Sequence, residues 1–218
     1  MFHYKGEKMA VASSNTDLHG YGEEIRKEIG RRIPQSKKLK VLDVGTGFGI
    51  NVAFLAGWLL KGSAVWTVDP SKEVLEDVKA SLDEESSRLV RFAVATADDL
   101  DFDDGFFDYV VSVMVLHHLE RLQPALKEMM RVLKRGGRLV VVDYKPQASR
   151  ELEFKTLHEE ADFFEPAVVL KGLGRLGTAG RATDFGMWYL VEANKEWSVA
   201  PRSPPPAGRP RRSKSGDT

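Results

Sequence analysis

The stretch Val41-Leu42-Asp43-Val44-Gly45-Thr46-Gly47-Phe48-Gly49 joins a short apolar run to three alternating glycines. The run Lys40–Val44 predicts a buried parallel strand, and the apolar segment Gly49–Lys61 predicts a helix after it. Gly45 and Gly47 allow a tight turn and let a ligand approach the backbone, because neither residue has a Cβ atom. The first turn of the helix offers unpaired N–H groups. The stretch therefore predicts a ligand-binding strand–loop–helix unit.

The loop departs from two phosphate-binding motifs. The third glycine of a dinucleotide-binding G-x-G-x-x-G motif would fall at Ile50, and no Lys-Ser or Lys-Thr pair follows to make a P-loop. Asp43 instead precedes the first glycine, where a carboxylate favours a cationic amino acid over a pyrophosphate. Asp69 follows the predicted strand Ala64–Val68, about 20 residues further on, where a carboxylate accepts hydrogen bonds from a ribose. A nucleoside with a cationic group is expected, and S-adenosylmethionine fits that description; a plain strand-to-helix turn is the alternative.

Strands and helices alternate through most of the chain. The predicted helices, one of them capped by Ser71, are Gly22–Ile33, Ser71–Ser81, Glu120–Lys134 and Ala148–Phe164. The further predicted strands are Leu89–Ala95, Phe106–Val115, Arg138–Asp143, Val168–Lys171 and Met187–Val191. Repeated βα units predict a parallel sheet covered by helices on both faces, with its ligand beyond the carboxyl ends of the strands.

Five segments carry a family resemblance: VLDVGTGFG (41–49), TVDPSKEVLE (67–76), ADDLDF (97–102), FFDYVVSVMVLHHL (106–119) and LKRGGRLVVVDY (133–144). In this order and spacing the chain resembles the class I S-adenosylmethionine-dependent methyltransferases, especially the ubiquinone/menaquinone-biosynthesis C-methyltransferases. The resemblance implies an α/β fold, with a doubly wound, seven-stranded and mostly parallel Rossmann-like sheet and a final antiparallel hairpin. It also implies S-adenosyl-L-methionine as cofactor and S-adenosyl-L-homocysteine as product.

The resemblance also implies a set of cofactor contacts. Asp43 and the glycine loop would hold the methionine part, Asp69 the ribose, and Pro70 would lie beside the adenine. Where the family often has an acid near the adenine amino group, this chain has Thr96, so either Thr96 or Asp98 makes that contact. The complete predicted set is Tyr21, Asp43, Gly45, Thr46, Gly47, Asp69, Pro70, Thr96, Ala97, Asp98 and Val113.

Catalytic candidates follow the fourth predicted strand. Methyl transfer from a sulfonium is an in-line displacement in which positioning supplies much of the acceleration, and a base is needed only if the acceptor loses a proton. His117 and His118 are candidates for that base; the alternative is that one of them packs beside the cofactor. Ser112–Met114 would line the pocket near the methyl group. His19 and Tyr21 would form a lid, with an ordinary N-terminal turn as the alternative. Candidate apolar wall residues, for which packing in the core is the alternative, are Phe163, Phe164, Val168 and Leu170.

The composition of the chain narrows the classes of molecule that it could bind or methylate. The 218 residues include 32 basic and 32 acidic residues and no cysteine, which excludes thiolate chemistry and zinc–thiolate sites, and we expect no metal. Zero net charge argues against nucleic acid as a partner of the whole chain. The region 112–116 lacks the Pro-Pro-Tyr-like turn of enzymes that methylate base amino groups. A small-molecule acceptor methylated on C, O or N is expected, with a protein or RNA methyltransferase and a non-catalytic binding module as alternatives.

The chain divides into three predicted regions. Residues 1–36 are an N-terminal helical lid or cap, residues 37–194 are the cofactor-binding methyltransferase domain, and residues 195–218 are a disordered tail rich in Pro and Arg. No apolar run approaches the roughly 20 residues of a membrane span, and Met1–Ala10 has no apolar core of a signal peptide. We expect no membrane partner and a cytoplasmic location; the oligomeric state is left open.

Overall fold

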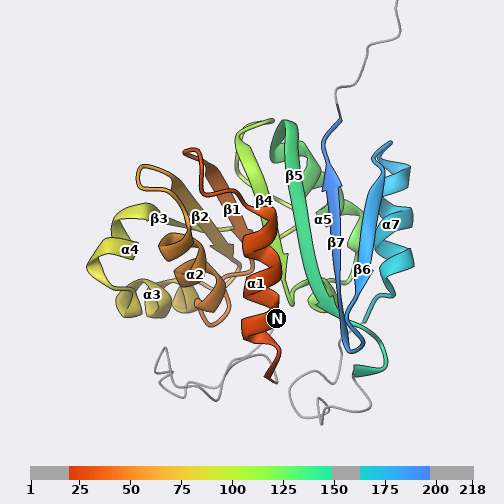
Figure 1. Cartoon of the computed structure of the whole chain (residues 1–218), viewed down its shortest axis with the longest axis horizontal. Helices are drawn as coiled ribbons and strands as arrows, with labels where there is room; N and C mark the ends of the chain where they lie inside the picture. The colour runs from red at the N-terminus through yellow and green to blue at the C-terminus, as the bar shows by residue number, and fades with distance from the viewer. Residues whose placement is uncertain (1–19, 149–162, 197–218) are drawn as a thin grey trace, which may run out of the picture.

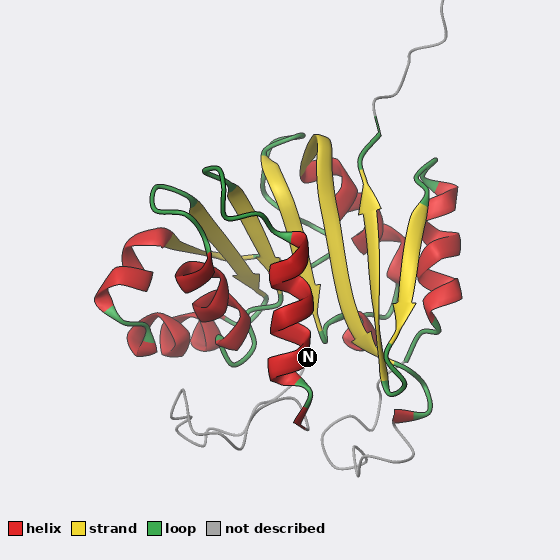
Figure 2. Ribbon diagram, in the orientation of Figure 1, coloured by secondary structure: helices red, strands yellow, loops and turns green. Residues whose placement is uncertain are grey.

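A seven-stranded mixed sheet forms the centre of the computed structural model, which describes residues 20–148 and 163–196 (Figure 2). The strand order is β3-β2-β1-β4-β5-β7-β6. The first five strands pair in parallel, while β7 runs antiparallel to both β5 and β6. The bounds are β1 (Lys40–Val44), β2 (Ala64–Asp69), β3 (Val90–Val94), β4 (Phe107–Val113), β5 (Leu133–Tyr144), β6 (Gly180–Asp184) and β7 (Trp188–Asn194). This topology confirms the predicted Rossmann-like α/β fold with a final antiparallel hairpin.

Helices cover both faces of the sheet. The bounds are α1 (Gly22–Arg32), α2 (Ile50–Trp58), α3 (Lys72–Ser81), α4 (Glu84–Leu89), α5 (Leu122–Val132) and α7 (Pro166–Arg175). Buried side chains of α1, α2 and α3 pack against one face, and those of α5 and α7 against the other. Figure 1 shows α1 and α2 in front of the sheet and α5 behind it. None of the helices in the described part of the chain is long and apolar enough to cross a membrane.

Local sequence explains several of these elements. Ser71 caps α3 as predicted, because its hydroxyl accepts a hydrogen bond from the backbone N–H of Val74 at 3.2 Å. In the same way Asp83 caps α4, a short helix that the sequence analysis did not predict, by accepting from Ser86 N at 2.8 Å. Apolar side chains recur along one side of α5, and that side lies on the core.

The predicted strand Val168–Lys171 is wrong, because these residues lie inside α7. Four consecutive apolar or long side chains fit a buried strand and a buried helix equally well, so periodicity does not separate them. Pro166 at the start of the helix was the better signal, since proline suits the first helical turn. The hairpin partner of β7 is instead β6, whose sequence Gly-Arg-Ala-Thr-Asp is too polar and exposed to read as a strand.

The structure also differs from the predicted bounds of two other elements. Strand β5 begins at Leu133 and not at Arg138, because the chain passes from α5 into the sheet without a loop. The pairing of β4 with β5 shifts register between Phe107 and Tyr109 to accommodate this early start. The predicted helix Ala148–Phe164 falls mostly on residues 149–162, outside the described residues, and Phe163 and Phe164 are not helical.

Lys195 attaches the end of β7 to the start of β5. Its backbone N–H donates to Gly137 O at 2.9 Å, and its carbonyl accepts from Gly136 N at 2.7 Å. Its ammonium donates to Arg131 O and Leu133 O at 2.8 and 2.7 Å. Burial of this ammonium lowers the pKa of Lys195. The residue that opens the predicted tail therefore belongs to the sheet by its contacts.

The carboxyl ends of the five parallel strands meet at one edge of the sheet, at the lower side of Figure 1. β1 and β4 are neighbours there, although they are far apart in the sequence. The helix that follows β1 packs on one face, and the helix that follows β4 packs on the other. The chain thus changes direction between β1 and β4, which is where α/β sheets of this kind bind ligands.

Candidate functional site

The glycine loop after β1 is fastened at its base and open at its tip. The backbone N–H groups of Gly45 and Thr46 both donate to Val68 O, at 2.9 and 3.0 Å, so the loop is tied to the end of β2. Gly45 has φ of 88°, and a Cβ placed on it would lie 2.3 Å from Val115 Cγ2. Gly47 has φ of 47°, and a Cβ on it would meet no atom within 4 Å. The backbone of Gly47 therefore borders open space, as a ligand-binding loop requires.

Asp69 lies at the rim of this loop. Its Oδ2 accepts from the backbone N–H of Gly47 at 3.2 Å, and its Oδ1 accepts from Ser71 N at 3.0 Å. A carboxylate has about four acceptor positions, so these two backbone bonds leave further capacity on both oxygens. The side chain is only partly buried. Its position and remaining capacity suit two neighbouring hydroxyl groups of a sugar.

Asp43 lies beneath the loop and not on the surface of the crevice. Its side chain is 0% exposed, and Oδ2 accepts from Thr67 Oγ1 at 2.8 Å, while Thr67 and Thr46 share a hydrogen bond of 2.7 Å. Oδ1 has no partner among the described residues. Burial raises the pKa of Asp43 to about 7; the Thr67 hydrogen bond opposes the rise and the nearby charge of Asp69 adds to it. A direct contact of Asp43 with the methionine part stays a prediction, and the geometry indicates support of the loop from below.

The predicted adenine side contains a cavity of about 290 Å³ beside the ends of β2 and β3. Pro70 and Thr96 both line it, as do Val94, Ala95, Asp99 and Asp101. Ala97 is buried in the core, and Asp98 is exposed at 3.9 Å from the guanidinium of Arg121. The structure thus brings Pro70 and Thr96 together but directs Ala97 and Asp98 elsewhere. Asp99 and Asp101, which were not among the predicted contacts, line this cavity, whereas the predicted alternative Asp98 does not.

The end of β4 borders the loop from the other side. Ser112 is fully buried, and its hydroxyl has no partner among the described residues. Val113 is 5% exposed, and Met114 adopts φ of 56°, a left-handed conformation that is strained for a residue other than glycine. This bend carries Val115 onto the glycine loop. The unpartnered hydroxyl of Ser112 and the strained turn at Met114 make this strand end a candidate part of the site.

His117 forms a buried pair with Asp143 from the end of β5. His117 Nδ1 lies 2.6 Å from Asp143 Oδ1, and the backbone N–H of His117 donates to Oδ2 at 3.2 Å. The two side chains are 2% and 1% exposed. His118 is exposed, and its ring centroid lies 4.1 Å from that of His117. Asp143 was not among the predicted site residues, because its contact with His117 depends on the pairing of β4 with β5.

The remaining candidates divide between the site and the core. Phe163 stacks on His117 with ring centroids 5.0 Å apart, whereas Phe164 and Leu170 pack against the core on the α5 face. Val168 is 45% exposed. Tyr21 immediately precedes α1 and packs against the apolar cluster of the opposite face. His19 lies outside the described residues, so the predicted lid stays a prediction.

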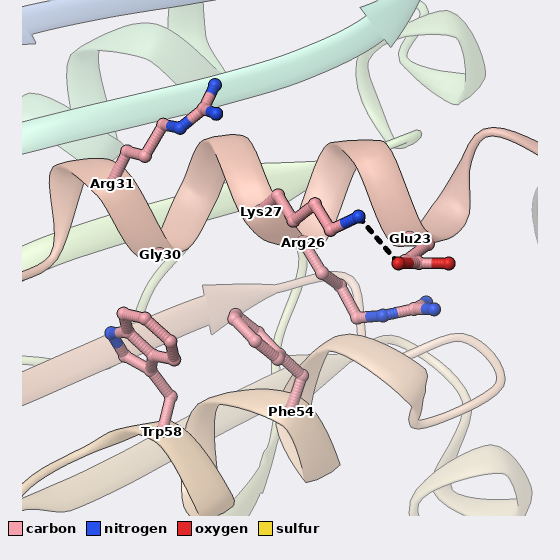
Figure 3. A pocket seen from close by; sticks show the side chains of 7 residues that line it. All are labelled: Glu23, Arg26, Lys27, Gly30, Arg31, Phe54 and Trp58. Carbon is pink, nitrogen blue, oxygen red and sulfur yellow. Dashed lines mark ion pairs between the residues drawn. The ribbon is translucent and has the colours of Figure 1, made fainter.

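A second cavity of about 400 Å³ lies on the outer surface between α1 and α2. Figure 3 shows Phe54 and Trp58 from α2 facing α1, where Lys27 pairs with Glu23. None of the predicted cofactor or catalytic residues lines this cavity. No group of three or more His, Asp or Glu side chains placed to hold a metal ion occurs among the described residues.

The residues at the switch point fit S-adenosylmethionine. The open backbone at Gly47 accommodates the amino-acid part, Asp69 has acceptor capacity for the ribose, and the cavity beside Pro70 and Thr96 has room for a base. The profile of the methyltransferase domain family matches residues 42–141, which include each of these positions. Residues 42–141 therefore match a methyltransferase domain of the S-adenosylmethionine-dependent kind.

Curated relatives support this assignment over part of the chain. The uncharacterized methyltransferase YcgJ of Bacillus subtilis is 33% identical over 109 residues, which are 50% of this chain and 42% of the relative. The O-methyltransferase cnsE of Penicillium expansum is 30% identical over 149 residues, 68% of this chain and 53% of the relative. The demethylmenaquinone methyltransferase of Mycolicibacterium gilvum is 30% identical over 158 residues, 72% of this chain and 61% of the relative. The chain spans about half the length of the first relatives.

Solved structures share the fold of this chain. The crystal structure of YcgJ from Bacillus subtilis superimposes with a TM-score of 0.68 at 16% identity, covering 80% of this chain and 99% of that chain. Geranyl diphosphate methyltransferase in complex with S-adenosylmethionine gives a TM-score of 0.68 at 15% identity, covering 85% of this chain and 94% of that chain. At these identities the likeness shows the fold alone.

Proposed function

We propose that this methyltransferase transfers a methyl group from S-adenosylmethionine to a C, O or N atom of a small molecule by in-line displacement. The observation that carries the proposal is the pairing of Asp69 with the open backbone of Gly47 at the switch point between β1 and β4. A carboxylate at this place accepts hydrogen bonds from the hydroxyl groups of a ribose, and the open glycine loop beside it leaves room for the rest of a nucleoside ligand.

The chain's own residues bind and orient the reactants. When bound, S-adenosylmethionine supplies a methyl group activated by its sulfonium. The Gly45–Gly47 backbone holds the amino-acid part, Asp69 accepts from the ribose hydroxyls, and Pro70 and Thr96 border the adenine. The end of β4, from Ser112 to Met114, faces the reacting groups. Holding two reactants at near-attack distance supplies much of the acceleration in such a displacement.

Relatives support a small molecule as the acceptor. The Mycolicibacterium gilvum relative is named a demethylmenaquinone methyltransferase and the Penicillium expansum relative an O-methyltransferase. The balanced net charge of the chain gives no general attraction to nucleic acid. A cytoplasmic location, with no membrane and no nucleic acid among the partners, belongs to the same proposal and stays a prediction from the sequence.

Calorimetric titration with S-adenosylmethionine tests cofactor binding directly. The wild type should bind, and Asp69→Ala should bind at least about 10-fold more weakly, because it loses charged hydrogen bonds to the ribose. Asp104→Ala is the matched control, since Asp104 is exposed and pairs with Arg131 away from the glycine loop. Transfer of a radiolabelled methyl group to a panel of phenols, quinols and amines then tests catalysis. Absence of binding by the wild type would refute the proposed function.

A further inference from the structure

Unpartnered buried polar atoms gather at the carboxyl edge of the parallel strands. In the described part of the chain, the buried side-chain atoms without a hydrogen-bond partner are Asp43 Oδ1, Asn51 Oδ1, Ser112 Oγ, Trp188 Nε1, Tyr189 OH and Arg32 Nε. Arg32 Nε still lies 3.3 Å from Glu192 Oε2, in an ion pair. The other five atoms form no ion pair within the described residues, although nearly all buried polar groups in folded proteins are hydrogen-bonded.

The five atoms share a place in the fold. Asp43 and Ser112 are the penultimate residues of β1 and β4, and Asn51 lies in the first turn of α2. Trp188 and Tyr189 begin β7, which runs antiparallel to β5, so they lie beside the end of β5. All five therefore lie where the parallel strands end and where this fold binds its ligands. Because an unpaired buried polar group is costly, we expect ligand atoms to be the partners of these five atoms.

The two halves of this edge are complementary to opposite kinds of ligand atom. Asp43 Oδ1 and Asn51 Oδ1, beside the glycine loop, are hydrogen-bond acceptors, and the ammonium group of S-adenosylmethionine is a donor. On the other half, the indole N–H of Trp188 only donates, and the hydroxyl groups of Ser112 and Tyr189 each carry a donor. This second half, where the molecule to be methylated must approach, is therefore complementary to atoms that accept hydrogen bonds.

Ser112 and Tyr189 lie on the same face of the sheet. Val110, two residues before Ser112, belongs with Tyr189 to the apolar cluster on the α5 face. Because side chains alternate along a strand, Ser112 also faces α5. Trp188 belongs to the cluster on the opposite face. A single ligand on the α5 face can therefore meet Ser112 and Tyr189 but not Trp188.

The charges around Tyr189 favour an uncharged ligand atom. Asp143 is its partner in the pairing of β5 with β7, and Glu165 directly precedes α7. Burial raises the pKa of Tyr189, and the charges of Asp143 and Glu165 raise it further. The hydroxyl group therefore keeps its proton and can donate, while the same two carboxylates repel an anionic ligand. A carbonyl oxygen accepts hydrogen bonds without carrying a charge.

We propose that Ser112 and Tyr189 bind an uncharged carbonyl group of the methyl acceptor, so that the substrate is a ketone, quinone, ester or amide and not a free amine or a carboxylic acid. Both residues are second from a strand end at the ligand edge, so the carbonyl group does not have to enter the core. This inference rests on the proposed function and names the chemical class of its substrate.

The first test needs no ligand. Tyr189→Phe removes only the hydroxyl group, and urea denaturation compares the midpoint of the variant with that of wild type. Because the hydroxyl has no partner within the described residues, the variant should unfold at the same urea concentration as wild type or at a higher one. A midpoint clearly below that of wild type would show that the hydroxyl group is bonded inside the protein, and it would overturn the inference.

The second test measures the binding of a ketone. The probes are 1-indanone, its parent hydrocarbon indane and the cation 1-aminoindane, each titrated by ligand-observed NMR against protein saturated with S-adenosylhomocysteine. Wild type should bind 1-indanone at least about 5-fold more tightly than either of the others, and Tyr189→Phe should reduce this preference at least about 3-fold. Ser112→Ala should change the preference in the same direction. Equal affinities of wild type for the three compounds, or no binding of 1-indanone, would overturn the inference.

Tyr109→Phe is the matched control. Tyr109 lies toward the amino end of β4 and is only partly buried, so loss of its hydroxyl group should leave the preference for 1-indanone unchanged. An equal change in Tyr109→Phe and Tyr189→Phe would refute the role of Tyr189. Such a failure would leave the proposed function standing if wild type binds S-adenosylmethionine in the calorimeter, whereas absence of that binding would refute the proposed function itself.

Discussion

The two halves of the sheet build their parts of the site in different ways. In the half formed by β1, β2 and β3, backbone geometry makes the site: three glycines with positive φ, and N–H groups that tie the loop to β2 and to Asp69. In the half formed by β4, β5, β7 and β6, side chains make it, through the contact of His117 with Asp143. The comparison teaches that cofactor binding in this fold depends on conformation, whereas acceptor chemistry depends on packing between distant segments.

The largest effect on stability and cofactor binding is expected from a substitution in the glycine loop after β1. Gly45→Ala forces a side chain into positive φ and places Cβ 2.3 Å from Val115 Cγ2. We expect the free energy of unfolding to fall by about 3 kcal/mol and S-adenosylmethionine binding to be lost. Gly47→Ala meets no neighbouring atom and should cost only about 1 kcal/mol. Urea denaturation and calorimetry measure both, and equal losses from the two variants would contradict this view of the loop.

Ionisation of Asp43 should make the free energy of unfolding fall as the pH rises. Because its pKa is raised to about 7 in the folded chain, the folded state binds more protons than the unfolded state below that pH. The contribution of Asp43 to the free energy of unfolding is therefore fully present below about pH 4, and it is lost as the pH rises from about 4 through about 7.

Asp43→Asn removes this titration. Relative to the variant, wild type should lose about 3 °C or more in Tm between about pH 5 and about pH 8. Thermal scans of both proteins across that range measure the difference. A constant offset between the two melting curves would mean that Asp43 stays ionised throughout.

A smaller effect is expected where α7 packs on α5. Gly172→Ala gains helix propensity but puts Cβ 2.6 Å from Leu126 Cδ1. A net loss of about 1 kcal/mol in the free energy of unfolding follows if overpacking outweighs the propensity gain. In the background of Leu126→Ala, where the obstructing atom is absent, the same change should stabilise the protein. A double-mutant cycle in urea measures this reversal, and additivity of the two changes would exclude the contact.

The smallest effect is expected on the outer surface. Lys27 forms an exposed ion pair with Glu23 beside the cavity between α1 and α2 (Figure 3). Lys27→Ala should change the free energy of unfolding by less than about 0.5 kcal/mol and leave methyl transfer unchanged. A marked fall in activity would mean that this surface contributes to the site.

Much of the half of the sheet formed by β1, β2 and β3 could be predicted from the sequence. β1, the glycine loop, the start of α2 and the place of Asp69 follow from local rules about apolar runs, glycine and strand ends. The errors are concentrated beyond β5. Val168–Lys171 is a helix because Pro166 starts it and Leu126 packs on it, and β6 is too polar to show an apolar pattern.

The candidate base was visible, but its partner was not. Nothing local indicates that His117 will meet Asp143, which lies 26 residues further along the chain. That contact exists only because β4 and β5 pair in register and bring their ends together. For the same reason the position of Asp43 under the loop, with its neighbour Thr67 on β2, emerges only from the folded sheet.

Lys195 has a practical consequence for handling the protein. Its backbone pairs with Gly136 and Gly137, and its ammonium holds the carbonyl groups where α5 passes into β5. A truncated version for crystallisation should keep this lysine, because deleting it would remove the contacts that hold the start of β5. An affinity tag or fluorescent label joined after Glu196 would start at the amino-terminal edge of the parallel strands, remote from where reactants enter.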